Sequence, residues 1–130
     1  MKNKQALSSC PFCSPEKLEI VAHSRKFYVI NDNAPVTPEH CLIIPYHHIA
    51  DPLDLKPEEI TEIWQLVQNI RKKLLAEDPS ISGFNVGFNS GHDAGQTIFH
   101  THIHLIPRRC GDVEKPRGGV RGVIPARQSY

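Results

Sequence analysis

The clearest periodic pattern in the chain is helical and predicts a helix that begins after Asp54 and ends near Glu77. Pro57 stands in the first turn, followed by two glutamates that suit the positive end of a helix. Apolar side chains then recur three or four residues apart, at Ile60, Ile63, Trp64, Val67, Ile70 and Leu74. This spacing predicts one apolar stripe packed against a core, with Trp64 as an anchor against a sheet.

Shorter apolar runs elsewhere in the chain predict strands. These runs are residues 18–22, 27–30, 41–44, 83–88 and 97–106. A polar turn at residues 23–26 joins the first two runs as a hairpin, and a glycine-bearing loop at residues 89–95 lets the last two pair. The predicted fold class is therefore α+β, a single domain with one long helix packed on an antiparallel sheet.

Composition and charge exclude several classes of protein. With 130 residues, 39% hydrophobic and 22% charged, the chain has the size and balance of one folded globular domain. A net charge of +1 gives no overall field that would attract nucleic acid or an anionic membrane, so we expect neither as a partner. Neither a signal peptide nor a membrane span is recognisable, which predicts a cytoplasmic protein.

The two ends of the chain differ in composition from the predicted domain centre. Residues 1–17 form an irregular arm that contains two prolines and two cysteines. Residues 109–130 form a basic tail that contains glycine and proline. Two interpretations of this tail remain open: a solvated basic segment, or a segment that reaches across a dimer to contact a polyphosphate.

Three histidines alternate along the last predicted strand. Side chains of a strand alternate between its faces, so His100, His102 and His104 are expected on one face, about 7 Å apart at Cα. Such a row is also consistent with the polar side of an amphipathic strand or with a metal-binding face. The preceding loop and Gln96 and Thr97 add hydrogen-bond donors for a phosphate. A neutral histidine attacks phosphorus when its other ring nitrogen donates to a carbonyl, which favours a nucleotide phosphate site.

Two segments carry a resemblance to a known family. Residues 94–108, AGQTIFHTHIHLIPR, resemble the signature of the histidine triad (HIT) family of nucleotide hydrolases and transferases. Residues 38–45 resemble the family's other characteristic strand, and Asp32 precedes His40 by eight residues, as the ribose-binding residue of the family does. The resemblance covers residues 10–108. Glu39 departs from it, because the family usually has glycine there, and we expect this change to alter the loop's backbone angle or to place a charge near the pocket rim.

The resemblance implies a HIT-like fold, a homodimer and a two-step reaction. His102 would attack the α-phosphate of a nucleotide and form a nucleotidyl-histidine intermediate, which water or another acceptor then releases, with His104 and Gln96 in support. The implied nucleotide-binding residues are Asp32, Asn31, His40, Asn89, Thr97, Phe27, Leu42 and Ile44. The last three are expected to be pocket walls, although each would serve equally as simple core.

The resemblance leaves the reaction itself open. A hydrolase of a nucleoside phosphoramidate or dinucleoside polyphosphate, a phosphorylase or nucleotidyltransferase, and a nucleotide-binding interaction protein with incidental turnover are all consistent with these residues. The apolar walls do not determine the preferred base.

Cys10 and Cys13 have the two-residue separation that lets both thiolates reach one zinc ion. The alternative is a pair of buried thiols without metal. HIT proteins with this cysteine pair complete the site with histidines that match His48 and His100, and His47 is an alternative to His48. A closed site of this kind implies a structural zinc, which would pin the arm and leave His102 as the free imidazole.

Overall fold

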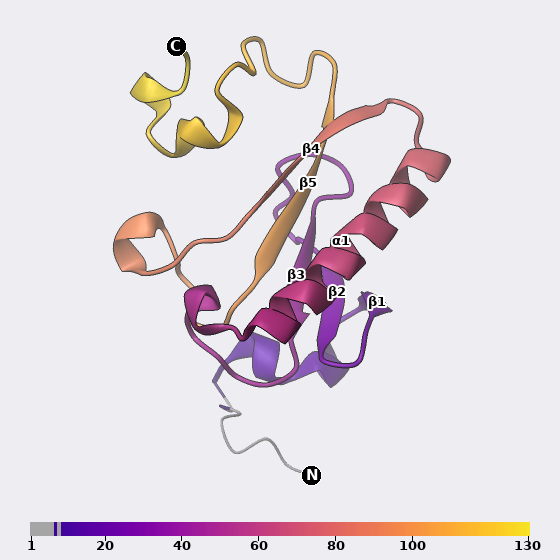
Figure 1. The fold of residues 1–130 in the computed structure, drawn as a ribbon, viewed down its shortest axis with the longest axis vertical. Coiled ribbons are helices and arrows are strands. Elements are labelled where there is room, and N and C mark those ends of the chain that lie inside the picture. Colours follow the sequence, from indigo (N-terminus) through magenta and orange to yellow (C-terminus); the bar gives the residue numbers. More distant parts are fainter. Residues whose placement is uncertain (1–6, 8) are drawn as a thin grey trace.

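Five antiparallel strands and one α-helix make up the fold in the computed structural model, which describes residue 7 and residues 9–130 (Figure 1). The elements are β1 (Ile20–His23), β2 (Phe27–Asn31), β3 (Cys41–Pro45), α1 (Pro57–Glu77), β4 (Ile81–Gly87) and β5 (Ile103–Arg109). The strand order is β1-β2-β3-β5-β4, with every neighbouring pair antiparallel. The predicted α+β class is confirmed.

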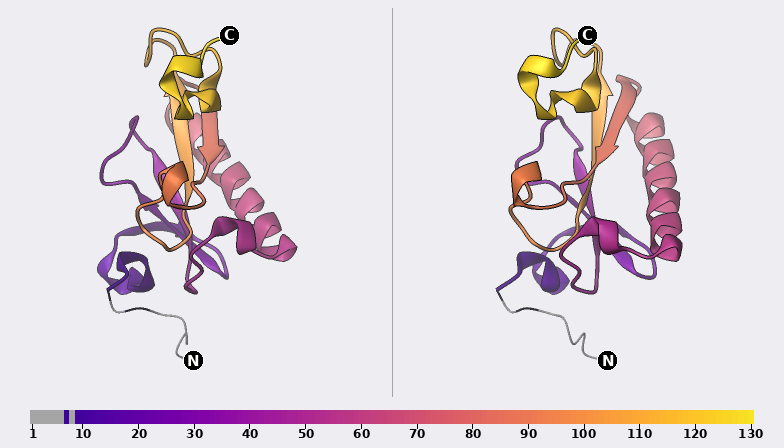
Figure 2. Two further views of the ribbon diagram at one scale, coloured as in Figure 1. Left: turned by 90° about the vertical axis from the view of Figure 1, so that its left-hand side faces the viewer. Right: turned by 60° about the vertical axis from the view of Figure 1, so that its left-hand side comes forward.

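The central strands are buried on both faces of the sheet. Phe27 and Val29 of β2 pack with Ile43 of β3 against α1, while the alternate residues Tyr28 and Ile30 pack with the N-terminal arm. This two-residue alternation produces one core under the helix and a second under the arm. Figure 2 shows α1 on one face and the arm, with the loop that precedes β5, on the other.

The helix has the predicted limits but a different buried face. Ile63, Leu66 and Val67 are buried, whereas Ile60 and Trp64 are 47% and 56% exposed. The prediction that Trp64 anchors the helix against the sheet is therefore wrong, because the contact face is rotated away from it. Among the described residues, no helix combines the length and the hydropathy needed to cross a membrane.

The last strand begins later than predicted. The main-chain N–H of Thr101 donates to the carbonyl of Ile49 at 2.7 Å, and Nε2 of the buried His100 lies 2.9 Å from the carbonyl of Pro45. These bonds hold the segment outside the sheet, and β5 starts only at Ile103. The three histidines therefore do not share one strand face: only His104 belongs to a strand.

The C-terminal tail folds into a small lobe of short turns, Gly119–Val123 and Pro125–Arg127 (Figure 1, yellow). The guanidinium carbons of Arg117 and Arg121 lie 4.7 and 5.0 Å from the ring centroid of Tyr130. Gly118 has a φ of 95°, and a Cβ atom there would lie 1.8 Å from the carbonyl oxygen of Gln128. The lobe is thus closely packed around its own glycines.

Candidate functional site

A cleft of about 530 Å³ lies on the face of the sheet opposite α1. It is lined by the N-terminal arm, the end of β2, the loop that follows β4, and the segment that carries the three histidines, residues 95–104. Seven of the predicted site residues line it: Asn31, Asp32, Leu42, Asn89, Thr97, His102 and His104. Its size is typical of small-molecule sites.

His102 is held in one orientation by its own backbone neighbourhood. Its Nδ1 lies 2.8 Å from the carbonyl oxygen of His100. A carbonyl oxygen only accepts hydrogen bonds, so Nδ1 carries the ring proton and Nε2 keeps its lone pair. An imidazole in this state has the form required of a nucleophile.

His104 and His40 form a chain of directed hydrogen bonds. The N–H of Val36 donates to Nδ1 of His40 at 3.0 Å, so the proton of His40 lies on Nε2. That Nε2–H donates to Nδ1 of His104 at 2.9 Å, which places the proton of His104 on its own Nε2. Burial lowers the pKa of His104 to about 4, helped by the nearby histidines. His104 is therefore neutral at pH 7, with one N–H left to donate.

Asp32 lies beside this histidine pair at the edge of the cleft. Its Oδ1 accepts from the N–H of Ala34 at 2.9 Å, and its Oδ2 lies 3.5 Å from Nε2 of His40 and 4.0 Å from Nδ1 of His104. These three side chains are close enough to hold a metal ion. The bond from Val36 opposes that, because it keeps the proton on the nitrogen of His40 that would have to bind the metal. Oδ2 of Asp32 therefore faces the histidine pair as a hydrogen-bond acceptor at the edge of the cleft.

Several predicted residues occupy other positions. Phe27 is fully buried under α1, on the opposite face of the sheet, so it cannot be a cleft wall. Ile44 is fully buried in the core under the arm and does not line the cleft. His40 is buried and reaches the cleft only through His104.

Gln96 has a different role from the one predicted. Its Nε2 donates to the carbonyls of Ala50 and Ile98 at 2.7 and 3.2 Å, and its Oε1 accepts from the N–H of Gly91 at 2.9 Å. The side chain is 2% exposed, and it is not among the residues that line the cleft. Gln96 therefore braces the loop, because its amide is fully used by the backbone.

Glu39 adopts the left-handed backbone conformation, with a φ of 72°. Residues other than glycine are strained in this conformation, so the backbone of Glu39 is strained at a position where the family usually has glycine. Its carboxylate lies 3.1 Å from the guanidinium of Arg109 and does not line the cleft. The charge is thus directed to the end of β5 and away from the pocket rim.

Sequence reasoning missed the part of the cleft that the N-terminal arm supplies. Pro11, Phe12 and Leu18 line the cleft together with Ile30 of β2. Phe12 lies between the two cysteines, so any site that orders the cysteines also places this ring. An aromatic residue within the cysteine pair was the signal that could have indicated it.

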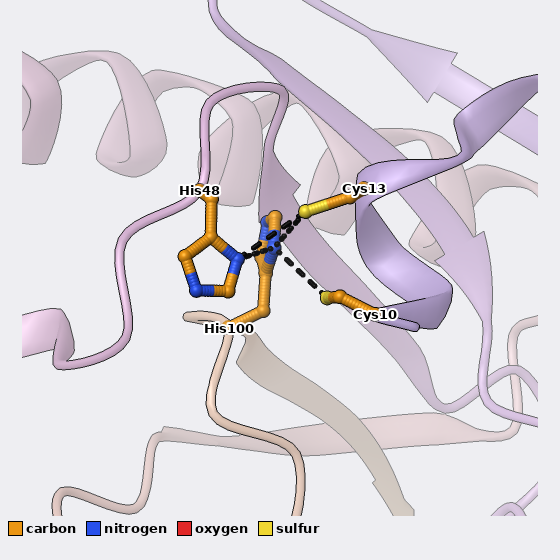
Figure 3. Close-up of side chains that lie close together, drawn as sticks. All are labelled: Cys10, Cys13, His48 and His100. Atoms are coloured by element: carbon orange, nitrogen blue, oxygen red, sulfur yellow. Dashed lines mark hydrogen bonds between the residues drawn. The ribbon is translucent and has the colours of Figure 1, made fainter. Parts of the chain in front are cut away.

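Cys10, Cys13, His48 and His100 converge at one point (Figure 3). Nδ1 of His100 lies 3.4 and 3.5 Å from the sulfurs of Cys10 and Cys13, and 3.1 Å from Nδ1 of His48. The edges of a tetrahedral zinc site with two sulfur and two nitrogen ligands are about 3.3–3.8 Å long, and the observed separations agree with them to within about 0.2 Å, so these donors fit zinc. The Nε2–H of His100 donates to the carbonyl of Pro45, which turns its Nδ1 lone pair toward the sulfurs.

A larger open groove, of about 940 Å³, is lined by His48 and by residues at the start of α1. It is lined by charged residues such as Arg25, Lys56 and Glu59 and includes no residue of the triad. The smaller cleft is therefore the candidate active site, because it contains His102 and His104 although the other groove is larger.

Two features together indicate the histidine triad class of proteins. One is the five-stranded antiparallel sheet with a single helix, and the other is the hydrogen-bonded histidine cluster beside a cleft large enough for a nucleotide. The sequence profile described as the HIT domain matches residues 16–111. The chain belongs to the HIT family.

Solved structures and curated relatives agree with this assignment. A HIT family protein from Bacillus anthracis is 34% identical, with a TM-score of 0.73 over 83% of this chain and 82% of that one. A Zn-bound histidine triad family protein from Mycobacterium smegmatis is 33% identical, with a TM-score of 0.72 over 80% of this chain and 78% of that one. The adenosine 5'-monophosphoramidase of Candida albicans is 34% identical over 109 residues, which are 78% of this chain and 72% of the relative.

Other curated relatives are longer than the matched region. The asymmetrical bis(5'-nucleosyl)-tetraphosphatase of Schizosaccharomyces pombe is 37% identical over 78 residues, or 60% of this chain but only 42% of the relative. The AP-4-A phosphorylase of Mycobacterium tuberculosis is 30% identical over 109 residues, or 83% of this chain and 55% of the relative.

Proposed function

We propose that the protein is a nucleotide hydrolase that acts at the α-phosphate through a nucleotidyl-histidine intermediate on His102. The observation that carries this proposal is the bond from Nδ1–H of His102 to the carbonyl of His100, which leaves Nε2 unprotonated beside a nucleotide-sized cleft. The relatives named as a monophosphoramidase and a tetraphosphatase support a nucleoside phosphoramidate or a dinucleoside polyphosphate as substrate.

The reaction has two displacement steps. In the first, Nε2 of His102 attacks the α-phosphorus, a P–N bond forms, and the bond to the leaving amine or phosphate breaks with its electron pair on the leaving group. In the second, water attacks the same phosphorus, the P–N bond breaks with its electron pair returning to Nε2 of His102, and the proton of the water passes to solvent as the nucleoside monophosphate leaves. The Nε2–H of His104, with Asn89 and Thr97, stabilises charge on the phosphoryl oxygens.

The walls of the cleft divide between ribose and base. Asp32 and Asn31 accept hydrogen bonds from the ribose hydroxyls. The apolar side chains of Phe12, Leu18 and Leu42 provide the surface for a base.

Phosphorolysis is a second candidate function. The Mycobacterium tuberculosis relative is named a phosphorylase, and inorganic phosphate in place of water in the second step would give that reaction on the same residues. The acceptor depends on what the open side of the cleft admits after the first leaving group departs.

A structural zinc ion held by Cys10, Cys13, His48 and His100 completes the proposal. The four donor atoms lie within 4.8 Å of one another, and a solved relative is Zn-bound. His47 is not in this set, because its Nε2 lies 3.3 Å from Oε2 of Glu59. With all four positions filled by the protein, this zinc would anchor the arm and would not activate water.

We also propose that the protein is a cytoplasmic homodimer. Ile60 and Trp64 on α1 remain exposed in one copy, and a second copy would cover them. None of the four cysteines, all of which lie within the described residues, forms a disulfide, which suits a reducing compartment.

The deciding experiment uses dinucleoside polyphosphates, nucleoside phosphoramidates and nucleotide sugars, with and without inorganic phosphate, and identifies the products by mass. Release of nucleoside monophosphate without added phosphate supports the hydrolase, and nucleoside diphosphate formed only with phosphate supports the phosphorylase. A His102→Asn variant should bind nucleotide but form no product. Turnover of none of these substrates by the unmodified protein would overturn the enzymatic proposal, leaving a nucleotide-binding interaction protein.

A further inference from the structure

The turn between the two cysteines contacts the nucleophile as well as the metal cluster. The Phe12 ring centroid lies 5.3 Å from that of His102 and 5.9 Å from that of His100, with interplanar angles of 64° and 82°. Phe12 is 6% exposed, and its carbonyl accepts a hydrogen bond from the hydroxyl of Tyr28 at 2.6 Å. The ring is therefore held in place by the cysteine on each side and by β2 beneath it.

His100 makes a second connection between the cluster and the nucleophile. Its ring joins the cysteine sulfurs and is fully buried, while its main-chain carbonyl accepts the Nδ1–H of His102. Ring and carbonyl belong to one residue, so whatever fixes the ring also limits where the carbonyl can lie. The bond that selects the tautomer of His102 thus depends on the anchoring of His100.

We propose that the metal loop is a positioning device for the nucleophile: metal bound by Cys10, Cys13, His48 and His100 presses Phe12 against His102 and keeps the His100 carbonyl on Nδ1 of His102. Metal occupancy then sets the rotamer and tautomer of His102. The proposal rests on the proposed role of His102 as nucleophile and assigns Phe12 a positioning role in addition to its place in the cleft wall.

The geometry around His102 explains why both contacts are needed. Its ring contacts both Phe12 and His104, whose ring centroids each lie 5.3 Å from its own. If Phe12 withdraws, the imidazole gains room on one side, and if the carbonyl moves, either ring nitrogen can carry the proton. Displacing a reacting group by about 1 Å can cost about 100-fold in rate.

The first test observes His102 directly in the full chain. Protein with ¹⁵N-labelled histidine is compared by NMR with zinc bound and after zinc has been removed by a chelator, and His102→Asn identifies the signals. We expect zinc-bound His102 to show a protonated Nδ1 and an unprotonated Nε2, and zinc-free His102 to show an average of both tautomers. The His40–His104 pair, which is bonded through Val36, is the internal control and should keep its signals. An unchanged His102 beside an altered His100 would overturn the proposal.

The second test keeps the metal and removes the ring, so it remains decisive if the zinc-free chain unfolds. Phe12→Ala is compared with Phe12→Leu and with Leu18→Ala, which shortens another side chain of the same cleft. With one zinc still bound per chain, Phe12→Ala should lower kcat about 10–100-fold and lose the single-tautomer signal of His102, Phe12→Leu should recover part of both, and Leu18→Ala should chiefly raise KM. If Phe12→Ala raises only KM and leaves the His102 signal intact, Phe12 is merely a wall. Because the NMR signals do not require turnover, failure of the proposed reaction remains distinguishable from failure of this inference.

Discussion

His40 and His104 are joined by a hydrogen bond of 2.9 Å from Nε2 of His40 to Nδ1 of His104. The two residues meet because β3 and β5 are paired so that Leu42 lies opposite His104, and His40 stands two residues before Leu42. The N–H of Val36 sets the direction of the bond by occupying the other nitrogen of His40. A backbone amide thus determines, through two imidazoles, which nitrogen of His104 donates in the cleft.

Replacing His40 should reduce activity, and the loss should be larger when the new side chain cannot donate a hydrogen bond to His104. We expect His40→Leu to lower kcat/KM about 100-fold, because His104 loses the donor that fixes its tautomer, and His40→Gln to lower it less, because the amide still donates. Steady-state kinetics measures both variants, and thermal unfolding provides the control for folding, since Leu also leaves the Val36 N–H unpaired. Equal activity of the Leu and Gln variants would contradict the directed chain.

Acidification should destabilise the protein through His104. Burial lowers its folded pKa from 6.5 to about 4, so between these pH values the unfolded chain binds more protons than the folded one. The free energy of unfolding therefore falls as the pH drops through this window, by at most about 3 kcal/mol from this residue. Urea unfolding at pH 7 and pH 5 should show a smaller loss for His104→Gln than for the unmodified chain. Identical losses would show that His104 does not titrate in this way.

The limits of α1 and the cysteine pair were predictable because they depend on local signals: Pro57 and the glutamates at the helix start, and the spacing of Cys10 and Cys13. His48 and His100 were expected beside the cysteines only from the family resemblance, because no local signal links residues so far apart in the chain. The start of β5 was not, because it depends on two distant carbonyls, those of Ile49 and Pro45, which hold Thr101 and His100 out of the sheet. Phe27 was misassigned for a similar reason. Alternation shows which residues share a face with it, but only the packed structure shows that this face meets the helix.

Glu39 provides a test of backbone strain without altering the cleft. A side chain in the left-handed region lowers the free energy of unfolding by about 1–2 kcal/mol. Glycine avoids this strain, but the greater freedom of its unfolded chain lowers the free energy of unfolding by about 0.5–1 kcal/mol. Both Glu39→Gly and Glu39→Gln remove the ion pair with Arg109, so their difference isolates the strain. We expect the glycine variant to have the higher free energy of unfolding, by about 0.5–1 kcal/mol, in urea titrations. A glycine variant no more stable than the glutamine variant would contradict this.

The exposed Trp64 provides a test of the proposed dimer. Trp64→Glu places a charge on apolar surface that a second copy would bury, whereas Gln65→Glu adds the same charge at the next residue, which is also exposed. Because Trp64 is 56% exposed in one copy, the substitution should leave the fold intact. Sedimentation should show a monomer for Trp64→Glu and a dimer for Gln65→Glu. If both variants sediment as the unmodified protein does, Trp64 lies outside any interface.

Two glycines with similar backbone angles, one after β5 and one at the C-terminal lobe, allow the cost of backbone strain to be distinguished from the cost of lost packing. Gly111 and Gly118 have φ values of 84° and 95°, but an added Cβ meets nothing within 4 Å at Gly111 and lies 1.8 Å from the carbonyl oxygen of Gln128 at Gly118. Gly111→Ala should therefore incur only the net cost of the left-handed conformation, about 0.5–1 kcal/mol after the lost freedom of the unfolded glycine is counted, whereas Gly118→Ala should also separate the turn from Gln128 and open the lobe. Hydrogen exchange measures this directly: amides of residues 119–128 should lose protection in Gly118→Ala and largely retain it in Gly111→Ala. Equal protection in the two variants would mean that the lobe is not held by this close approach, and proteolysis confined to the tail provides an independent check.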